Sequence, residues 1–301
     1  MGDIGGQAVI EGVMMRSGNV YAIAVRAPDR DIVFKKEIIK ELPKYLKWPI
    51  VRGVIALGQA LSIGIRALLY SAEASGHDEE KPSDLSLVIT VLVSFIIGIG
   101  LFFLLPLYST KLLGSVYKSI SDSSLMFNLV DGVIRVAFFL IYILSISMMK
   151  DIRRVFEYHG AEHKVVHAFE AGVELTPENA DNYSTLHPRC GTSFLIMVML
   201  LSIIVFSLIP KGWPFLEKFM SRIVLIPLIA GLSYEFIKLS SKKMGNPFIS
   251  FMSMPGLWLQ KLTTGTPSLD QIEVAIKALK ETLGKDSSGE GAEEIKSNVV
   301  G

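Results

Sequence analysis

The chain has 301 residues, of which 50% are hydrophobic and only 20% are charged, and its mean hydropathy is +0.44. The 30 Lys and Arg residues nearly balance the 29 Asp and Glu residues, which argues against a nucleic-acid-binding protein that works through a basic face. The high hydrophobicity argues against a disordered chain, and the single cysteine excludes a disulfide framework.

The first 48 residues predict a small antiparallel sheet. Residues 8–10, 13–15 and 21–25 are rich in strand-forming side chains, and turn-forming residues follow at 17–19 and 27–30. Residues 1–30 contain no apolar stretch typical of a signal peptide. We therefore expect the segment 1–48 to be a β-rich unit in the cytoplasm.

Residues 49–76 predict an amphipathic helix. Arg52, Gln59, Arg66 and Glu73 recur every seven residues and so fall in one polar stripe, while the other side chains are mostly small or apolar. Such a helix lies in the membrane interface, and a re-entrant element is the alternative. A polar linker at 77–84 is expected to follow it.

Four apolar runs predict transmembrane helices, because a span needs roughly 20 apolar residues. Two of them, 85–108 and 125–149, fall in the segment 85–149, and the other two, 193–210 and 223–239, fall in the segment 193–239. The second run contains Asp131 and Arg135, and the fourth contains Glu235. The predicted fold is thus an α-helical integral membrane protein with about four transmembrane helices, an amphipathic helix and a small N-terminal sheet.

The distribution of basic residues predicts the orientation. Eleven Lys and Arg residues precede the first span, whereas the loop after it carries two. The segment 150–192 carries five, three of them directly at the end of the second span, and the loop before the fourth span carries three, including Arg222. Since cytoplasmic loops are enriched in basic residues, we expect both termini and the segment 150–192 in the cytoplasm.

The segment 240–284 predicts a cytoplasmic loop followed by a capped helix. Residues 255–266 look like a loop, and Ser268 with Gln271 forms a capping box. Apolar residues then recur with a helical period up to Leu283. Residues 285–301 are polar and charged, which favours a disordered tail.

Four of the five histidines lie between residues 159 and 187, and the sole cysteine, Cys190, follows three residues later. His159, His163 and His167 are spaced by four on a predicted helix over 154–171. Neighbouring histidines are then ~6 Å apart along the helix axis and the outer two are ~12 Å apart. Neighbouring pairs can bind one metal ion, but all three cannot easily share it.

Residues 159–163 also fit the pattern H-x-x-E-H, in which two histidines bind zinc and the glutamate acts as general base. His187 and Cys190, on a Pro- and Gly-containing loop, would add two ligands of the types that zinc prefers. We therefore expect a divalent ion, Zn²⁺ or similar, on His159, His163, His187 and Cys190, with Glu162 as the base. A closed set of four ligands would be structural, and a set with water in one position would be catalytic.

Other residues are candidates to orient these ligands or to replace one of them: His167, Glu157, Glu170, Glu11 and Glu235. Arg16 is a candidate for binding an anion, and the i,i+4 pair Asp131 and Arg135 is expected to neutralise itself. Two alternatives stand beside the metal site. The histidines can form a solvated helix face, or Cys190 can be a nucleophile with a histidine base.

Five segments carry a resemblance to a known family: GGQAVIEGVMMR at 5–16, YHGAEHK at 158–164, HPRCGT at 187–192, PGLWLQ at 255–260 and QIEVA at 271–275. Together they resemble the signatures of the YqhQ-like bacterial membrane proteins, over about residues 4–280. The resemblance implies a bacterial inner-membrane protein from a domain family of unknown function, described as a metal-dependent enzyme with no known substrate.

These observations lead to the expectation of a hydrolytic metal-dependent enzyme at the cytoplasmic face of the membrane. Its surroundings would be membrane lipids, and its substrate a lipid-linked molecule or a membrane protein. The main alternative is a non-enzymatic scaffold or assembly factor whose loop is held by the metal. A transporter is less favoured, because the spans carry few ionisable residues and the metal-type ligands lie outside them.

Overall fold

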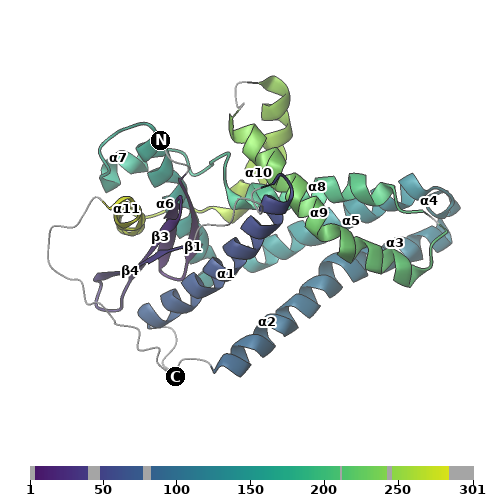
Figure 1. The fold of residues 1–301 in the computed structure, drawn as a ribbon, viewed down its shortest axis with the longest axis horizontal. Coiled ribbons are helices and arrows are strands. Elements are labelled where there is room, and N and C mark those ends of the chain that lie inside the picture. Colours follow the sequence, from purple (N-terminus) through teal and green to yellow (C-terminus); the bar gives the residue numbers. More distant parts are fainter. Residues whose placement is uncertain (1–3, 40–47, 77–82, 211, 243–245, 285–301) are drawn as a thin grey trace.

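The computed structural model describes residues 4–39, 48–76, 83–210, 212–242 and 246–284. The predicted tail at 285–301 and most of the predicted linker at 77–84 lie outside these residues. The strands and α11 gather at one end of the molecule, and long helices extend from there to α3 and α4 at the other end (Figure 1).

Four strands form the predicted antiparallel sheet, in the order β1-β2-β3-β4. They are β1 (Ile4–Val9), β2 (Gly12–Ser17), β3 (Val20–Arg26) and β4 (Ile32–Ile38). The turn between β2 and β3 contains Gly18 at φ +60°, a conformation that glycine adopts without strain. The prediction of a small N-terminal sheet is confirmed.

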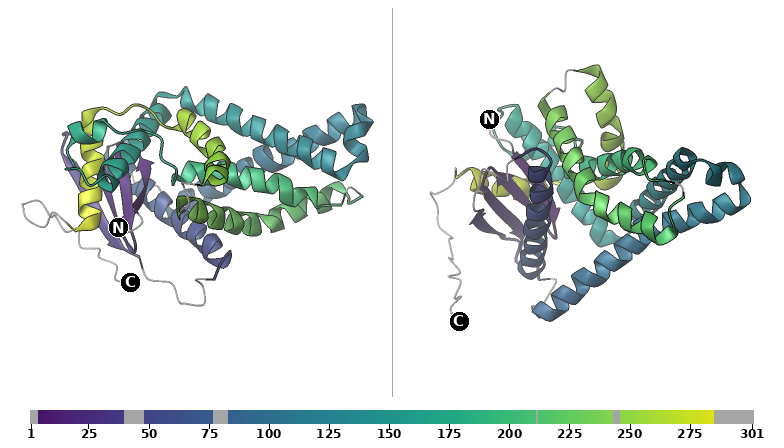
Figure 2. Two further views of the ribbon diagram at one scale, coloured as in Figure 1. Left: turned by 90° about the horizontal axis from the view of Figure 1, so that it is seen from above. Right: turned by 45° about the vertical axis from the view of Figure 1, so that its right-hand side comes forward.

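Helices cover both faces of this sheet, because successive side chains of a strand point to opposite sides. On one face, Val13 and Met15 are buried against α6 (Lys150–Glu170) and α11 (Leu269–Leu283). On the other face, Met14 and Ile23 are buried against α1 (Val51–Ala74). Figure 2 shows the sheet between α1 and the yellow helix α11. The predicted capping box opens α11, as Ser268 and Gln271 bond reciprocally.

Helix α1 joins the sheet to the long helices. Its second half contributes buried Ile63 and Ala67 to the core under the sheet. Its first half packs on α9 (Phe215–Lys242), where a Cβ atom on Gly53 would lie 2.9 Å from Tyr234. The helix predicted at 49–76 is confirmed, and it is also long and apolar enough to cross a membrane.

Among the described residues, three helices have the length and composition of a membrane span: Val51–Ala74, Leu85–Val116 and Ser124–Ser147. The second comprises α2 (Asp84–Ile99), the π-helical turn η2 (Gly100–Leu104) and α3 (Leu105–Val116), and the third is α5 (Ser124–Ser147). The short α4 (Lys118–Asp122) connects α3 to α5. The apolar runs at 85–108 and 125–149 thus form long helices, as predicted.

The two later predicted spans fall on α8 (Gly191–Ser207) and α9, neither of which is among these three helices. Helix α8 is apolar but has only 17 residues. Helix α9 has 28 residues with Pro227 inside it. Because α9 begins at Phe215, Arg222 lies within the helix and is 1% exposed, so its assignment to a loop was wrong.

The prediction of a loop at 255–266 was wrong for residues 255–263, because α10 (Pro247–Thr263) continues through Pro255. Proline removes one backbone donor from a helix, but tertiary packing can override this cost. Gly256 lies so close to α8 that a Cβ atom there would be 2.6 Å from the Ser193 hydroxyl. Leu259 is buried with residues of α5 and α8. Packing against these two helices thus maintains α10.

A buried ionic group lies between α5, α8 and α9. Asp131 accepts bonds from Arg135 at 2.7 Å, as predicted, and from Arg222 at 2.8 Å. Arg222 also donates to Asn128 at 2.9 Å, and Arg135 to Ser202 at 3.1 Å. Two guanidinium groups therefore share one carboxylate, and the rings of aromatic residues lie against them.

Candidate metal centre

Helix α6 carries three of the histidines and starts directly after α5, with only Met148 and Met149 between them. The second half of α6 is buried on the side that faces the sheet and the following loop. Gly160 permits the close approach of Gly265, whose backbone amide donates to the Phe156 carbonyl at 2.7 Å. The histidines are therefore held on a rigid, buried helix next to a long apolar one.

Gln260 of α10 fixes the loop that carries His187 and Cys190. Its side-chain oxygen accepts from the His187 amide at 2.8 Å, and its nitrogen donates to the His187 carbonyl at 2.8 Å and to Ser193 at 3.0 Å. Cys190 then caps α8, where the Thr192 amide donates to its sulfur at 3.4 Å. Spacing in the sequence gives no sign of this role for Gln260, although it ends the PGLWLQ segment.

The structure brings together His159, His163 and Cys190, which we call the thiolate group because cysteine binds metal ions as its thiolate. One potential ligand atom of each lies within 4.8 Å of the others. The Nε2 atom of His159 is 3.1 Å from the Cys190 sulfur, and the rings of His159 and His163 have centroids 4.4 Å apart. Two imidazole nitrogens and a sulfur are the ligand types that zinc prefers, and three protein ligands leave a fourth position open.

The hydrogen bonds of both histidines suit metal ligation. The Nδ1 atom of His159 is 2.8 Å from the Thr263 carbonyl, and that of His163 is 2.5 Å from the Thr185 carbonyl. A carbonyl accepts only, so each Nδ1 carries a hydrogen, and in the neutral form of the ring the lone pair is on Nε2. The Nε2 atom of His163 is buried and has no hydrogen-bond partner within the described chain. Metal-binding histidines are oriented in this way, so the thiolate group fits a divalent ion.

Glu162 of α6 is buried, and its carboxyl group lies against strand β1 of the sheet. The backbone amide of Gly6 hydrogen-bonds its carboxyl group, and a Cβ atom on Gly6 would lie 2.9 Å from a Glu162 carboxyl oxygen. Burial raises the pKa of Glu162 to about 7, although nearby His159 and the Gly6 amide act in the opposite direction. Glu162 is therefore a candidate proton acceptor near His159.

His187 lies in a second group, with His167 and Glu170, which we call the carboxylate group. Ligand atoms of these three also lie within 4.8 Å of one another. The His167 and His187 ring centroids are 4.5 Å apart, whereas those of His163 and His187 are 5.8 Å apart. Burial, followed by nearby His167 and His163, lowers the pKa of His187 to about 3, so this imidazole is neutral.

The remaining predicted site residues bond to partners other than the histidines and Cys190. Glu11 pairs with Arg154, Glu157 accepts from Gln271, Glu235 pairs with Arg52, and Arg16 donates to the Gly18 carbonyl. Each of these contacts links two elements or closes a turn, so the structure gives these four residues a role in folding.

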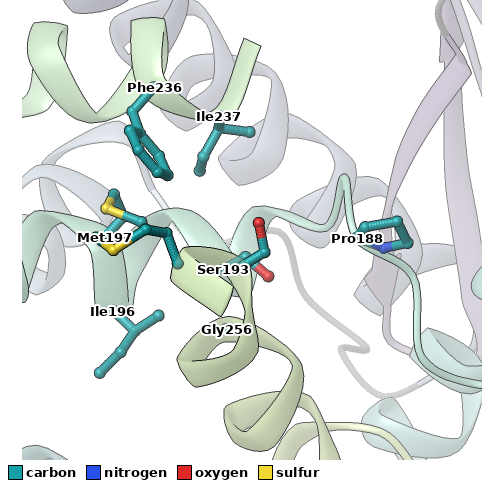
Figure 3. A pocket seen from close by; sticks show the side chains of 9 residues that line it. Pro188, Ser193, Ile196, Met197, Phe236, Ile237 and Gly256 are labelled. Atoms are coloured by element: carbon teal, nitrogen blue, oxygen red, sulfur yellow. The ribbon is translucent and has the colours of Figure 1, made fainter. Parts of the chain in front are cut away.

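A narrow, mostly apolar hollow adjoins the loop between His187 and Cys190. Pro188 of this loop and Ser193, Ile196 and Met197 of α8 line it, together with Phe236 of α9 and Gly256 of α10 (Figure 3). Pro188 and Ser193 flank Cys190 in the sequence. The hollow therefore shares one loop and helix α8 with Cys190, although Cys190 does not line it.

Two comparisons with known proteins identify the same family of unknown function. A family model described as a protein of unknown function (DUF1385) matches residues 48–285. The uncharacterized protein YqhQ of Bacillus subtilis (strain 168) is 35% identical over 313 residues, covering 98% of this chain and 97% of the relative. No solved structure matches the chain.

Proposed function

The chain belongs to the YqhQ-like family of unknown function, and we propose that it is a metal-dependent hydrolase of the bacterial cytoplasmic membrane. The observation that carries the proposal is the thiolate group, in which three ligand atoms lie within 4.8 Å of one another and the buried Nε2 of His163 has no hydrogen-bond partner among the described residues. A buried polar atom without a partner is costly, and a metal ion at this point would satisfy it.

In a hydrolytic step, each residue around the thiolate group would have a separate role. A bound Zn²⁺ or similar ion would act as a Lewis acid and lower the pKa of water. Glu162 accepts a proton from the attacking water, whose oxygen forms the new bond to the substrate carbonyl carbon or phosphorus. Glu162 then returns the proton to the leaving group as the bond to that group breaks. Carbonyl oxygens of Thr263 and Thr185 keep both histidines oriented.

The surroundings support a substrate at the membrane surface. Cys190 caps the apolar helix α8, and α6 follows directly from the apolar helix α5. The most apolar stretch of the helix Leu85–Val116 contains no buried residue, and this suits contact with lipid. A lipid-linked molecule or a membrane protein is therefore the proposed substrate.

The proposed orientation places the sheet and the thiolate group in the cytoplasm. Lys150, Arg153 and Arg154 at the start of α6 support this, because basic residues are enriched on the cytoplasmic side of a span. A cysteine accessibility scan tests it. Ser121→Cys in a Cys190→Ser background should react with a membrane-impermeant thiol reagent in intact cells, and Glu178→Cys should react only in opened cells. The reverse pattern would contradict the orientation.

Glu162→Gln tests the hydrolytic role. The variant keeps the shape of the side chain but cannot accept the proton, so turnover should fall about 10²–10⁴-fold. Hydrolysis would be followed with chromogenic carboxylic and phosphate esters and with lipid vesicles, beside metal content. Glu178→Gln, an exposed residue of α7, is the control. Full activity of Glu162→Gln with retained metal would exclude Glu162 as base. Metal without hydrolysis in the wild type would favour the scaffold.

A further inference from the structure

We infer that the carboxylate group, His167, Glu170 and His187, binds a second divalent transition-metal ion beside the one proposed for the thiolate group. This inference rests on the proposed function only in placing the first ion. His167 and Glu170 are three residues apart on α6 and so share one face of the helix, and His187 approaches from the following loop. Ligand atoms of all three lie within 4.8 Å.

The four imidazoles form a row that divides into two sites. In the order His159, His163, His187, His167, successive ring centroids are 4.4, 5.8 and 4.5 Å apart. The widest separation, between His163 and His187, falls between the two groups. The ligand atoms form two groups that share no residue, so each end of the row is a separate candidate for one ion.

The hydrogen bonds of the carboxylate group leave a ligand atom on His167, whereas His187 must change tautomer to offer one. The Nε2 atom of His167 donates to the Leu186 carbonyl at 2.9 Å, so in the neutral form of the ring Nδ1 is the atom that could bind a cation. The Nε2 atom of His187 faces Glu170 at 3.5 Å, too far for a strong hydrogen bond. To bind a cation through this Nε2, His187 must carry its hydrogen on Nδ1. Nδ1 can then no longer accept the 3.3 Å hydrogen bond from the Arg189 amide.

Arg189 supplies the counter-charge for Glu170 in this structure, since its guanidinium group pairs with the other carboxyl oxygen. A divalent ion on Glu170 would compete with this ion pair. Two imidazoles and one carboxylate suit zinc, iron or manganese more than calcium or magnesium, which prefer oxygen ligands. The occupant is therefore a first-row transition ion, and two neighbouring ions are a known arrangement for hydrolysis.

Cobalt substitution distinguishes the two sites, because only the thiolate group contains sulfur. Purified full-length protein would be loaded with Co²⁺, and total cobalt would be measured beside the near-ultraviolet thiolate-to-cobalt absorption band. The wild type should bind two ions per chain. His167→Ala should bind one and keep the band, and Cys190→Ser should bind one and lose it. Glu174→Gln, an exposed carboxylate after α6, is the control and should keep two ions.

Two further variants guard against misfolding of His167→Ala. Glu170→Gln, which keeps the side-chain shape, should also lose one ion without loss of the band. Arg189→Gln should bind the second ion about tenfold more tightly, because it removes the competitor. One ion in the wild type, with the band intact, would overturn the second site and leave the first. No cobalt and no band in any sample would instead remove the proposed function.

Discussion

The Nε2 atom of His159 lies 3.1 Å from the Cys190 sulfur, although 31 residues separate the two in the chain. His159 belongs to α6, which packs on the sheet, and Cys190 caps α8, which packs on α5 and α10. The candidate metal centre therefore lies at the junction of the sheet unit and the apolar helices. Residues that hold this junction together should control metal binding without being ligands.

Gln260→Met tests this control. The substitution removes three buried hydrogen bonds that hold His187 and Ser193, while it retains side-chain volume. Since residues that position metal ligands typically contribute 10–100-fold to affinity, metal affinity should fall by about that factor. Competition with a chelator measures it, and Gln59→Met on α1 is the control. Unchanged affinity in Gln260→Met, with an unchanged melting temperature, would show that the loop is held by other contacts.

Gly6→Ala tests the close packing over Glu162. A Cβ atom at this position would lie 2.6 Å from the Met14 carbonyl and 2.9 Å from the Glu162 carboxyl group. Overpacking of this kind costs about 1–3 kcal/mol, and the variant should melt at a lower temperature and lose turnover as Glu162 is displaced. Gly5→Ala is a matched control on the same strand, because nothing lies within 4 Å of its Cβ position. Equal melting temperatures for the two variants would contradict the proposed packing.

The buried ionic group predicts an asymmetry between two substitutions. Asp131→Asn leaves Arg135 and Arg222 buried without a carboxylate, whereas Arg222→Met leaves the neutral pair of Asp131 and Arg135. Asp131→Asn should cost about 3–5 kcal/mol, because it leaves buried charges without a partner of opposite sign. Arg222→Met should cost less, because Asp131 and Arg135 still pair with each other. Asp131→Asn should therefore lower the melting temperature in detergent much more than Arg222→Met. The opposite order would indicate that Arg222, not Asp131, organises the group.

Local patterns in the sequence predict the sheet, the spacing of the histidines and the capping box of α11, because each depends on residues close together in the chain. The sheet follows from strand-forming stretches separated by turns, and His159 and His163 share a face of α6 because they are one helical turn apart. The helix over 49–76 is predicted from its polar stripe, but its packing under Met14 and Ile23 is not, since the stripe does not reveal its partner.

Features that depend on distant contacts could not be predicted. The sequence groups His187 with His159, His163 and Cys190 by ligand type, whereas the structure places it with His167 and Glu170. This placement depends on Gln260, 73 residues away. The sequence does not predict α10, because a proline such as Pro255 normally interrupts a helix. In the structure, contacts with α8 outweigh that tendency. The sequence does not predict that Arg222 is buried in a helix, because its partner, Asp131, is 91 residues away.

The most direct test of the central claim is the metal content of purified protein, measured by elemental mass spectrometry for the wild type, His163→Ala and Cys190→Ser. Purification without chelators, with Glu178→Gln as the control, would guard against stripping and misfolding. We predict metal bound to the wild type and the control, and one ion fewer per chain in each of the two ligand variants. Equal metal content in all four proteins would contradict the assignment of His163 and Cys190 as ligands.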